Sequence, residues 1–480
     1  MLSVAPQLRP SLDPQFLPAA LWHRAYRALV AADPGSRPFA IVLGRTDGAV
    51  FRHDSRVLSA GHPAAALTLT YAERLLKFLL WMKGGPQVLV AGADEIAAAL
   101  AKIYSPTGAR AFDHAFMGQK IFGRAFSVEA ASFDALPATV ETSLPMGRNL
   151  GGCRIGFDLG GSDRKAAALI DGEVVFSEEI AWDPYFQTDP SYHIEGVHDS
   201  LKRAAAHLPR VDAIGGSAAG VYVNNEVRAA SLFRGVPAEA FEKHIRRMFF
   251  TLQERWGGVP FEVVNDGEVT ALAGSMSMND NAVLGVSMGT SQAGGYVTPT
   301  GNITPWLNEL AFAPIDYRPE APCDEWSGDI GCGVQYFSQQ GVGRLAKRAG
   351  FTFPATLPLP EQLIEVQHAM KAGDARARDL RVHRGVLWLR DRALRGVLRG
   401  AKSAGPRAGD VGRRRRGDSG AGAGGVARRV PDARGDHPTA HAGREEQAPR
   451  PGDGRGEFAG AAGGALSAGR ALDSPCGPTS

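Results

Sequence analysis

The sequence predicts a mixed α/β protein with more than one domain, followed by a long segment of different character. Short runs of β-branched and apolar residues alternate with stretches of helical periodicity over the first 378 residues. The chain has 480 residues, of which 44% are hydrophobic, so it can build two to four domains with sizeable cores. The composition then changes abruptly at Asp379.

Several classes of protein are excluded by composition. No apolar run approaches the roughly 20 residues that a membrane helix needs. The first 22 residues are broken by proline and charge, and they lack the compact apolar core of a signal peptide. Four cysteines in a chain of this length do not make a disulfide framework. We therefore expect a soluble, cytoplasmic protein with no membrane partner.

Residues 1–150 are expected to form an extra α/β domain. Its predicted elements, in chain order, are a helix at Ala19–Val30, a hairpin of 39–44 with 49–58 around the Asp47-Gly48 turn signal, a helix at Tyr71–Lys83 that ends at Gly84-Gly85, a buried strand at 87–92 and a capped helix at Asp94–Tyr104. No catalytic constellation is evident here, and Asp47, His53 and His114 are interpreted as surface or turn residues. No helix-turn-helix pattern is evident either, so we expect no nucleic-acid partner.

Residues 151–280 restart with a strand and are expected to form a first lobe. The predicted order is three antiparallel strands, a helix, a strand, a long helix over Ala238–Trp256 and a short strand, FEVVND. Such a lobe places its ligand-facing turns at the strand ends. Residues 281–378 repeat the theme of strand, glycine-rich turn and strand, which predicts the start of a second lobe.

Two glycine-rich turns are candidate phosphate sites. In IGFDLGGSDRK, Gly160 and Gly161 allow backbone N–H groups close to an anion, Ser162 adds a hydroxyl, and Asp158 suits hydrated Mg²⁺. In SMGTSQAGG, the residues suited to cradle phosphate oxygens are Gly289, Thr290 and Ser291. Taken alone, each turn is equally well explained as an ordinary hairpin.

A candidate general base lies between these turns, in VVNDGEVTALAGS (Val263–Ser275). A strand ends at Asn265-Asp266 and a helix follows, which would direct a carboxylate into a cleft. The alternative is that Asp266 is only the N-cap of that helix.

Taken together, the three motifs resemble the superfamily of actin, sugar kinases and heat-shock-chaperone ATPases. The best match within it is the ROK family of bacterial sugar kinases and related repressors: DLGGS is similar to its first phosphate motif, ND to its catalytic motif, and MGTSQAGG to its second phosphate motif. The resemblance implies a two-lobed actin-like ATPase (ribonuclease H-like) fold over residues 151–350, preceded by the extra α/β domain. It also implies ATP and Mg²⁺ as cofactors and a small-molecule sugar or sugar-like substrate.

The resemblance implies a role for each motif residue. Asp266 would take the proton from a sugar hydroxyl as it attacks the γ-phosphoryl group, and Asp158 would orient Mg²⁺ through water. Asn265 and Glu309 would hydrogen-bond the sugar. The phosphate-binding residues would be Gly160, Gly161, Ser162, Gly289, Thr290 and Ser291.

The zinc motifs of the family are missing. Its G-E-x-G-H motif is replaced by NELAF (Asn308–Phe312), which keeps Glu309 but has Phe312 at the histidine position. Its C-x-C-G-x-x-G-C cluster is replaced by EWSGDIGC, which keeps only Cys332, with Cys323 nearby but out of register. One or two thiolates do not make a closed tetrahedral site, so we expect no zinc site.

Residues 379–480 differ from the rest of the chain. Gly, Ala and Arg make up 56 of these 102 residues, which carry a net charge of +8 against −5 for residues 1–378. A disordered basic tail or a nucleic-acid patch at Arg413–Arg416 would fit this composition. Translation out of frame explains more, because the genetic code permits a one-nucleotide shift of the stretch around Glu445–Gln447 to be read as RHGQAMAAASLPA, similar to the family's last helix. We therefore expect a disordered, out-of-frame tail and an impaired ATP site.

Two functions remain open at this stage. The leading interpretation is an ATP-dependent phosphotransferase acting on a sugar hydroxyl. The alternative is a non-catalytic sensor or scaffold of the same fold that binds a sugar or a nucleotide, favoured by the lost zinc motif and the unusual N-terminal domain. A homodimer is left as an option in both cases.

Overall fold

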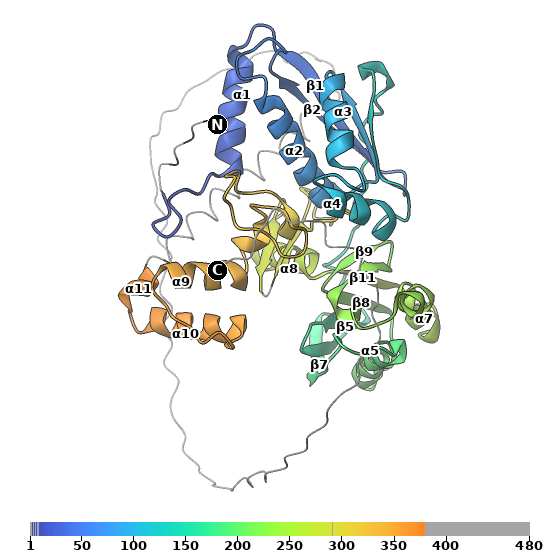
Figure 1. Ribbon diagram of the computed structural model, residues 1–480. Helices are drawn as coiled ribbons and strands as arrows, with labels where there is room; N and C mark the ends of the chain where they lie inside the picture. The colour runs from blue at the N-terminus through green and yellow to red at the C-terminus, as the bar shows by residue number, and fades with distance from the viewer. Residues whose placement is uncertain are drawn as a thin grey trace, which may run out of the picture. The chain divides into compact units, whose positions relative to one another are not determined.

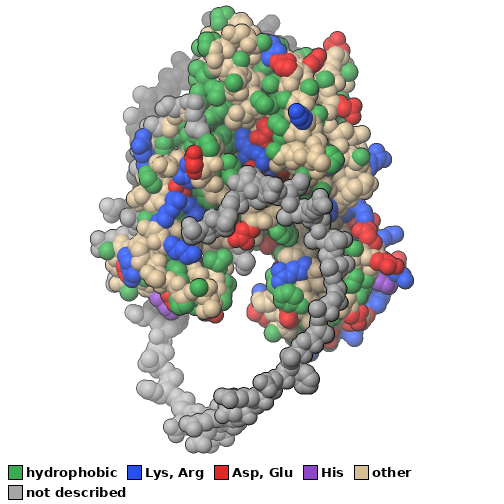
Figure 2. Space-filling view, viewed as in Figure 1, with side chains coloured by type: hydrophobic (Ala, Val, Ile, Leu, Met, Phe, Trp, Pro, Cys, Tyr) green, Lys and Arg blue, Asp and Glu red, His purple; other side chains and the backbone are tan. Residues whose placement is uncertain are grey.

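The computed structural model describes residues 2, 4, 6, 9–289, 291–378 and 380 (Figure 1). It is a mixed α/β structure, as the sequence predicts. Thr290 and the tail predicted from residue 379 lie outside the described residues, apart from Leu380. Among the helices of the described part, none is both long enough and apolar enough to cross a membrane. Basic and acidic side chains are interspersed on the face shown in Figure 2.

The N-terminal unit contains a four-stranded sheet in the order β2-β1-β3-β4, in which β1 is antiparallel to β2 and β3, and β3 is parallel to β4. The predicted partly parallel sheet is therefore confirmed. Gly48 has φ +84° in the β1–β2 turn, a conformation that glycine adopts without strain. The bounds are α1 (Ala19–Ala32), β1 (Arg37–Gly44), β2 (Val50–Val57), α2 (Leu67–Lys83), β3 (Gln87–Ala91), α3 (Asp94–Ile103), α4 (Ala111–Ala115) and β4 (Ser127–Ala130).

Two helix boundaries differ from the prediction. Helix α2 begins at Leu67, four residues before Tyr71, and ends as expected at Gly84, whose N–H donates to the carbonyl of Leu80. The cap expected for α3 is wrong, because its N-cap is Ala93, which makes no side-chain hydrogen bond. Asp94 is instead the first helical residue, where its negative charge favours the positive end of the helix dipole.

The core of the N-terminal unit extends into a segment more than 200 residues away. Trp22, Tyr26 and Trp81 belong to one buried cluster with Phe312 and Val334. The backbone is joined at the same place, since the N–H groups of residues 308 and 309 donate to the carbonyls of residues 82 and 81, at 3.0 and 2.9 Å. The core of the N-terminal unit is therefore continuous with the segment that carries Glu309.

The first lobe contains a five-stranded sheet in the order β11-β8-β5-β6-β7. Strands β5, β6 and β7 are antiparallel, whereas β8 and β11 run parallel to β5. This is the strand order and direction of a ribonuclease H-like lobe, which confirms the predicted fold. Its elements are β5 (Cys153–Leu159), β6 (Asp163–Ile170), β7 (Glu173–Ala181), α5 (Pro190–Ala205), β8 (Ala213–Ala218), α7 (Met248–Arg255) and β11 (Phe261–Asn265).

The single long helix expected over Ala238–Trp256 is wrong. The segment is divided into a short α6 (Ala238–Ala240), a π-helical turn (Phe241–Ile245) and α7. The carbonyl of Arg246 accepts a hydrogen bond from the N–H of Val227, so it is directed toward a neighbouring strand. That strand, β10 (Glu226–Ala229), forms an unpredicted hairpin with β9 (Val221–Val223), and the Asn-Asn turn between them has positive φ at both residues.

Helix α8 (Asp266–Met278) packs directly on the backbone of the second glycine-rich hairpin, β12 (Leu284–Met288) and β13 (Gln292–Tyr296). A Cβ added at Gly295 would lie 2.2 Å from the carbonyl oxygen of Gly267, and one at Gly285 would lie 2.5 Å from the backbone of Ala271. Only glycine permits this approach. The chain continues through α9 (Gln339–Arg348), α10 (Leu359–Lys371) and α11 (Ala375–Arg378).

We predict that Gly295→Ala lowers the free energy of unfolding by about 1–3 kcal/mol, because the new methyl group meets rigid backbone. Gly274→Ala, on the same helix α8, is the matched control, since its Cβ would meet only side-chain atoms at 3.8–3.9 Å. Removing a helical glycine there should raise stability by about 0.5–1 kcal/mol. Urea denaturation measures both, and equal effects of the two variants would contradict the proposed close packing.

Candidate functional site

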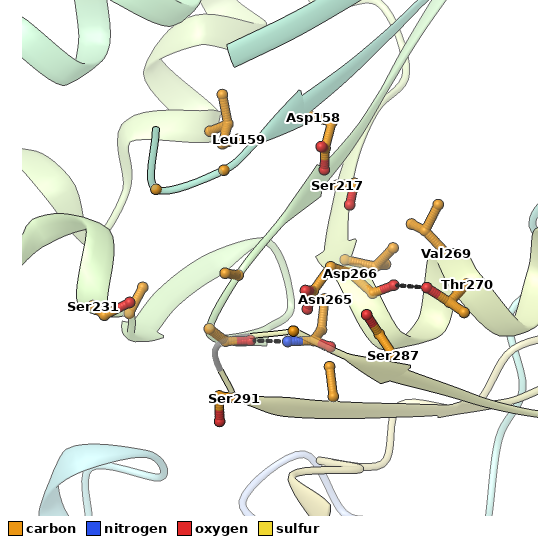
Figure 3. Close-up of a pocket in the computed structure, with 18 of the residues that line it drawn as sticks. Asp158, Leu159, Ser217, Ser231, Asn265, Asp266, Val269, Thr270, Ser287 and Ser291 are labelled. Carbon is orange, nitrogen blue, oxygen red and sulfur yellow. Dashed lines mark hydrogen bonds between the residues drawn. The ribbon is translucent and has the colours of Figure 1, made fainter. Parts of the chain in front are cut away.

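A cleft of about 1540 Å³ lies where the motifs meet. Its walls include the ends of β5, β8 and β11, the start of α8 and the second glycine-rich hairpin (Figure 3). The structure brings most of the predicted site residues into this cleft. Those that line it are Asp158, Gly160, Gly161, Asn265, Asp266, Gly289, Ser291 and Glu309.

Asn265 and Asp266 divide the two roles that the sequence left open. The Oδ1 atom of Asn265 accepts from the N–H of Gly267 at 2.7 Å, so Asn265 is the N-cap of α8. Its Nδ2 atom donates to the carbonyl of Gly220 at 2.7 Å (Figure 3). Asp266 is the first residue of the helix, and its carboxyl group belongs to the wall of the cleft. The N-cap of α8 is therefore Asn265 and not Asp266.

Parallel strands bring a second carboxylate close to Asp266. Asp158 on β5 pairs in register with Ser217 on β8, and Asn265 on β11 pairs with the next residue of β8. Figure 3 shows Asp158, Ser217 and Asp266 in the same part of the cleft. Burial raises the pKa of Asp266, and the nearby carboxylate of Asp158 raises it further. A raised pKa strengthens a carboxylate as a general base near neutral pH.

Glu309 is a third carboxyl group in this cleft. It is half-buried, and its pKa is raised to about 8, first by burial and then by Asp266. At neutral pH it is therefore mostly protonated and can donate a hydrogen bond as well as accept one.

Glu268 is a functional candidate that the sequence analysis missed. It is buried, its Oε1 atom accepts from Nδ2 of Asn308 at 2.8 Å, and burial raises its pKa to about 8. Asn308 has φ +49°, so this hydrogen bond holds a strained residue immediately before Glu309. The available signal was its position in the NDGE motif, two residues after Asp266.

In the first glycine-rich hairpin, two of the groups expected to donate to phosphate instead donate hydrogen bonds within the hairpin. The N–H of Gly160 donates to the carbonyl of Asp163 at 2.9 Å, which closes the turn. Ser162 is exposed and does not belong to the cleft lining, and its hydroxyl donates to the carboxylate of Asp163 at 2.7 Å. Lys165, which the sequence analysis did not single out, lines the cleft and pairs with Asp163 at 2.7 Å.

The second hairpin is joined to α9. The N–H of Gly289 donates to the carbonyl of Ser291, and the carbonyl of Gly289 accepts from the N–H of Gln339, both at 2.9 Å. Ser291 is exposed and lines the cleft. Ser338 caps the helix that follows.

Aromatic rings occupy the place of the family's zinc motif. The ring of Phe312 lies 4.3 Å from that of Trp81, centroid to centroid, and 6.2 Å from that of Trp326. Within the described residues, no group of three His, Cys, Asp or Glu side chains is placed to hold a metal ion. The absence of zinc nevertheless stays a prediction. For Mg²⁺ the donors are suitable, since this ion keeps several waters and needs only one or two carboxylates besides phosphate oxygens, and Asp158 offers one in the cleft.

A buried ion-pair network fixes the segment that carries Trp326. Asp329 pairs with Arg110 at 2.6 Å and with Arg74 and Lys77 at 3.2 Å each. Lys77 also pairs with Asp113 at 2.9 Å. Burial acts to raise the pKa of Asp329, but the charges of Arg74 and Lys77 outweigh it and hold the pKa below its ordinary value.

This network was not predicted, although Arg74 and Lys77 lie in a helix that the sequence indicated. Two charged residues on a largely apolar helix could have indicated a buried ion pair. The partner residue, Asp329, lies 255 positions after Arg74.

Neither a protein-family model nor a curated protein sequence matches the chain.

Solved structures of ROK proteins are similar to it. A ROK hexokinase from Thermus thermophilus is 18% identical, with 48% of this chain and 72% of that chain covered and a TM-score of 0.37. A ROK family transcriptional regulator, a homolog of the E. coli MLC protein, is 19% identical, with 49% and 59% covered and a TM-score of 0.38. A glucokinase from Parabacteroides distasonis is 16% identical, with 48% and 66% covered and a TM-score of 0.35. At these identities the likeness says nothing about activity or substrate.

We predict that Asp329→Asn lowers the free energy of unfolding by about 3 kcal/mol, because it removes the carboxylate that Arg74, Lys77 and Arg110 share and leaves only Glu73 and Asp113 to pair with them. The matched control is Glu195→Gln, which removes an exposed ion pair with Arg255 and should change stability by less than about 0.5 kcal/mol. Chemical denaturation measures both variants. A cost for Asp329→Asn as small as that of the control would show that the network is not needed.

We predict that Glu268→Gln reduces the dependence of stability on pH between about pH 5 and pH 8. In the unfolded chain Glu268 ionises near its ordinary pKa of 4.5, whereas in the fold it keeps its proton until about pH 8. The unfolded state thus binds fewer protons in this window, so stability falls as pH rises, by about 1.4 kcal/mol per pH unit for each such group. Glutamine can still accept the hydrogen bond from Asn308, but it does not titrate, so the contribution of Glu268 to the pH dependence of stability is lost.

Glu309 contributes a similar slope of its own, so the variant should retain part of the pH dependence. Exposed Glu239→Gln is the control and should leave the slope unchanged. Urea denaturation at several pH values provides the measurement, and an unaltered slope in Glu268→Gln would disprove the assignment.

Proposed function

We propose that this chain has the site of an ATP-dependent phosphotransferase that acts on a sugar hydroxyl. The observation that supports the proposal most strongly is the position of Asp266. Because Asn265 caps α8, Asp266 is relieved of that task and lies in a cleft whose lining includes both glycine-rich hairpins.

In the proposed reaction Asp266 accepts the proton of the sugar hydroxyl as its oxygen attacks the terminal phosphoryl group of ATP. Glu309 and the remaining amide hydrogen of Asn265 hold neighbouring hydroxyls and so aim the attacking one. The neutral state of Glu309 near pH 7 suits this role, because it avoids a third negative charge beside Asp158 and Asp266.

The phosphate chain would lie along the two hairpins, near Gly161, Gly289, Ser291 and Lys165. Lys165 would neutralise part of the charge that develops on the phosphoryl oxygens. Asp158 is the residue that would hold Mg²⁺, through water, and the bound ion would supply positive charge to offset that of the phosphate oxygens.

The second candidate is a non-catalytic sensor or scaffold of the same fold. Phe312 in place of a zinc-binding histidine favours it, because the sugar pocket is then shaped differently. One of the similar solved structures is a transcriptional regulator. A sensor would bind sugar without turnover, so sugar-dependent release of ADP separates the two functions.

We also propose that the reading frame changes near Arg378. In the family, the adenine clamp and the closing helices follow that point, so the 480-residue chain would phosphorylate poorly. A chain with the frame restored after Arg378 would then be the more active form.

We predict that Asp266→Asn lowers kcat for sugar phosphorylation by at least about 10²-fold, since the general base is lost while the side chain keeps its size. Sugar and ATP affinities should change little. Asp134→Asn, an exposed carboxylate far along the chain from the motifs, is the control and should retain full activity.

The measurement is ADP release with a panel of sugars, made on the 480-residue chain and on the frame-restored chain. Activity of Asp266→Asn equal to that of its parent would eliminate Asp266 as the base. ATP binding by neither parent chain would contradict the phosphotransferase proposal as a whole.

A further inference from the structure

We propose that Trp326 is a stacking platform for the apolar face of a neutral pyranose ring bound in the cleft. This inference rests on the proposed function, because it places the sugar in the same cleft as Asp266. It goes further by naming the residue that selects a ring with a flat C–H face.

The exposure of Trp326 is the first observation. Its side chain is 64% exposed, which is high for a tryptophan, and it lines the same cleft as Asp266 and Glu309. An exposed indole in a concave site presents a large apolar area to water, and this area is available to a ligand.

The orientation of the ring is set before any ligand arrives. The indole lies nearly parallel to the ring of Phe312, at an interplanar angle of 8° and a centroid distance of 6.2 Å. The ring of Phe116, from the N-terminal unit, packs against it at 6.3 Å with a tilt of 52°. Such contacts restrict the indole beforehand, so that binding a ligand costs less side-chain entropy.

The loop that carries Trp326 is equally constrained. The carboxylate of Asp324 accepts from the N–H and the hydroxyl of Ser327, at 2.7 and 2.6 Å. The N–H of Asp324 donates to the carbonyl of Asp329 at 2.8 Å, which closes the loop at its base. Asp329 in turn is held by the buried ion-pair network, so the platform is anchored to α2.

The chemistry around the indole indicates the kind of ligand. A pyranose has C–H groups on one face and hydroxyl groups at its edge, and the cleft offers an aromatic face together with carboxyl and amide groups. The carboxyl groups of Asp158, Asp266 and Glu325 all line this cleft, which disfavours a negatively charged sugar acid or sugar phosphate beside them. A neutral sugar fits best.

The test is isothermal titration of the full 480-residue chain with D-glucose, D-mannose, D-galactose and N-acetyl-D-glucosamine, each without nucleotide. We expect Trp326→Ala to weaken binding of the preferred sugar about tenfold, since it removes one apolar face from the contact. Trp326→Phe should stay within about threefold of the parent, because it keeps an aromatic ring there.

Trp256→Phe is the control, since Trp256 lies after α7 and outside the cleft lining, and its sugar affinity should equal that of the parent. Affinity for a non-hydrolysable ATP analogue should be the same in all four chains. Thermal unfolding of each variant checks that an affinity change does not come from loss of the fold.

Three results would overturn the inference: sugar affinity unchanged in Trp326→Ala, a loss confined to the ATP analogue, or no binding of any of the four sugars by the parent chain. Sugar binding that depends on Trp326, in a chain that never transfers phosphate even after frame restoration, would remove the proposed phosphotransferase and leave the platform in place. Phosphate transfer that is unaffected by Trp326→Ala would remove the platform and leave the proposed phosphotransferase in place.

Discussion

The pairing of Asp329 with Arg74, Lys77 and Arg110 is the interaction on which the rest of the site depends. Buried charges are costly unless every one of them is paired, so only one placement of the 324–332 segment against α2 satisfies the group. That placement also determines where Trp326 lies. Near the end of α2, the carbonyls of Trp81 and Met82 accept backbone hydrogen bonds from Glu309 and Asn308, which fixes the position of that segment.

Ion pairs and aromatic contacts thus occupy the region where the resembled family has zinc. A metal ion joins loop segments through a few strong bonds, whereas here Phe312 and Trp326 pack with rings of the N-terminal unit. This gives the N-terminal unit a role that the sequence did not suggest. It supports one wall of the cleft, both through buried apolar contacts and through the ion pairs with Asp329.

Helix α8 joins the second glycine-rich hairpin to the candidate base Asp266. Its first turn carries Asp266 toward the cleft and Glu268 toward Asn308, while its glycine contacts fix the second hairpin at backbone distance. A displacement of α8 would therefore move Asp266, the segment that carries Asn308 and Glu309, and the second glycine-rich hairpin together. Such coupling suits a reaction that depends mainly on positioning.

The sequence by itself determined the strands and turns of both glycine-rich hairpins, the order of strands and helices along the chain in the first lobe and the pair Asn265-Asp266, because these follow from local periodicity and turn chemistry. Of the ten site residues that the sequence predicted, the structure describes nine, and eight of these line the cleft. The sequence did not indicate how their hydrogen bonds are shared: Asn265 caps α8, and the hydroxyl of Ser162 donates to Asp163. Tertiary structure alone decided the roles of Glu268, Lys165 and Trp326, the break of the helix at Arg246 and the network around Asp329. Each of these depends on partners distant in sequence, and local patterns carry no information about which distant residue will neutralise a buried charge or receive a hydrogen bond.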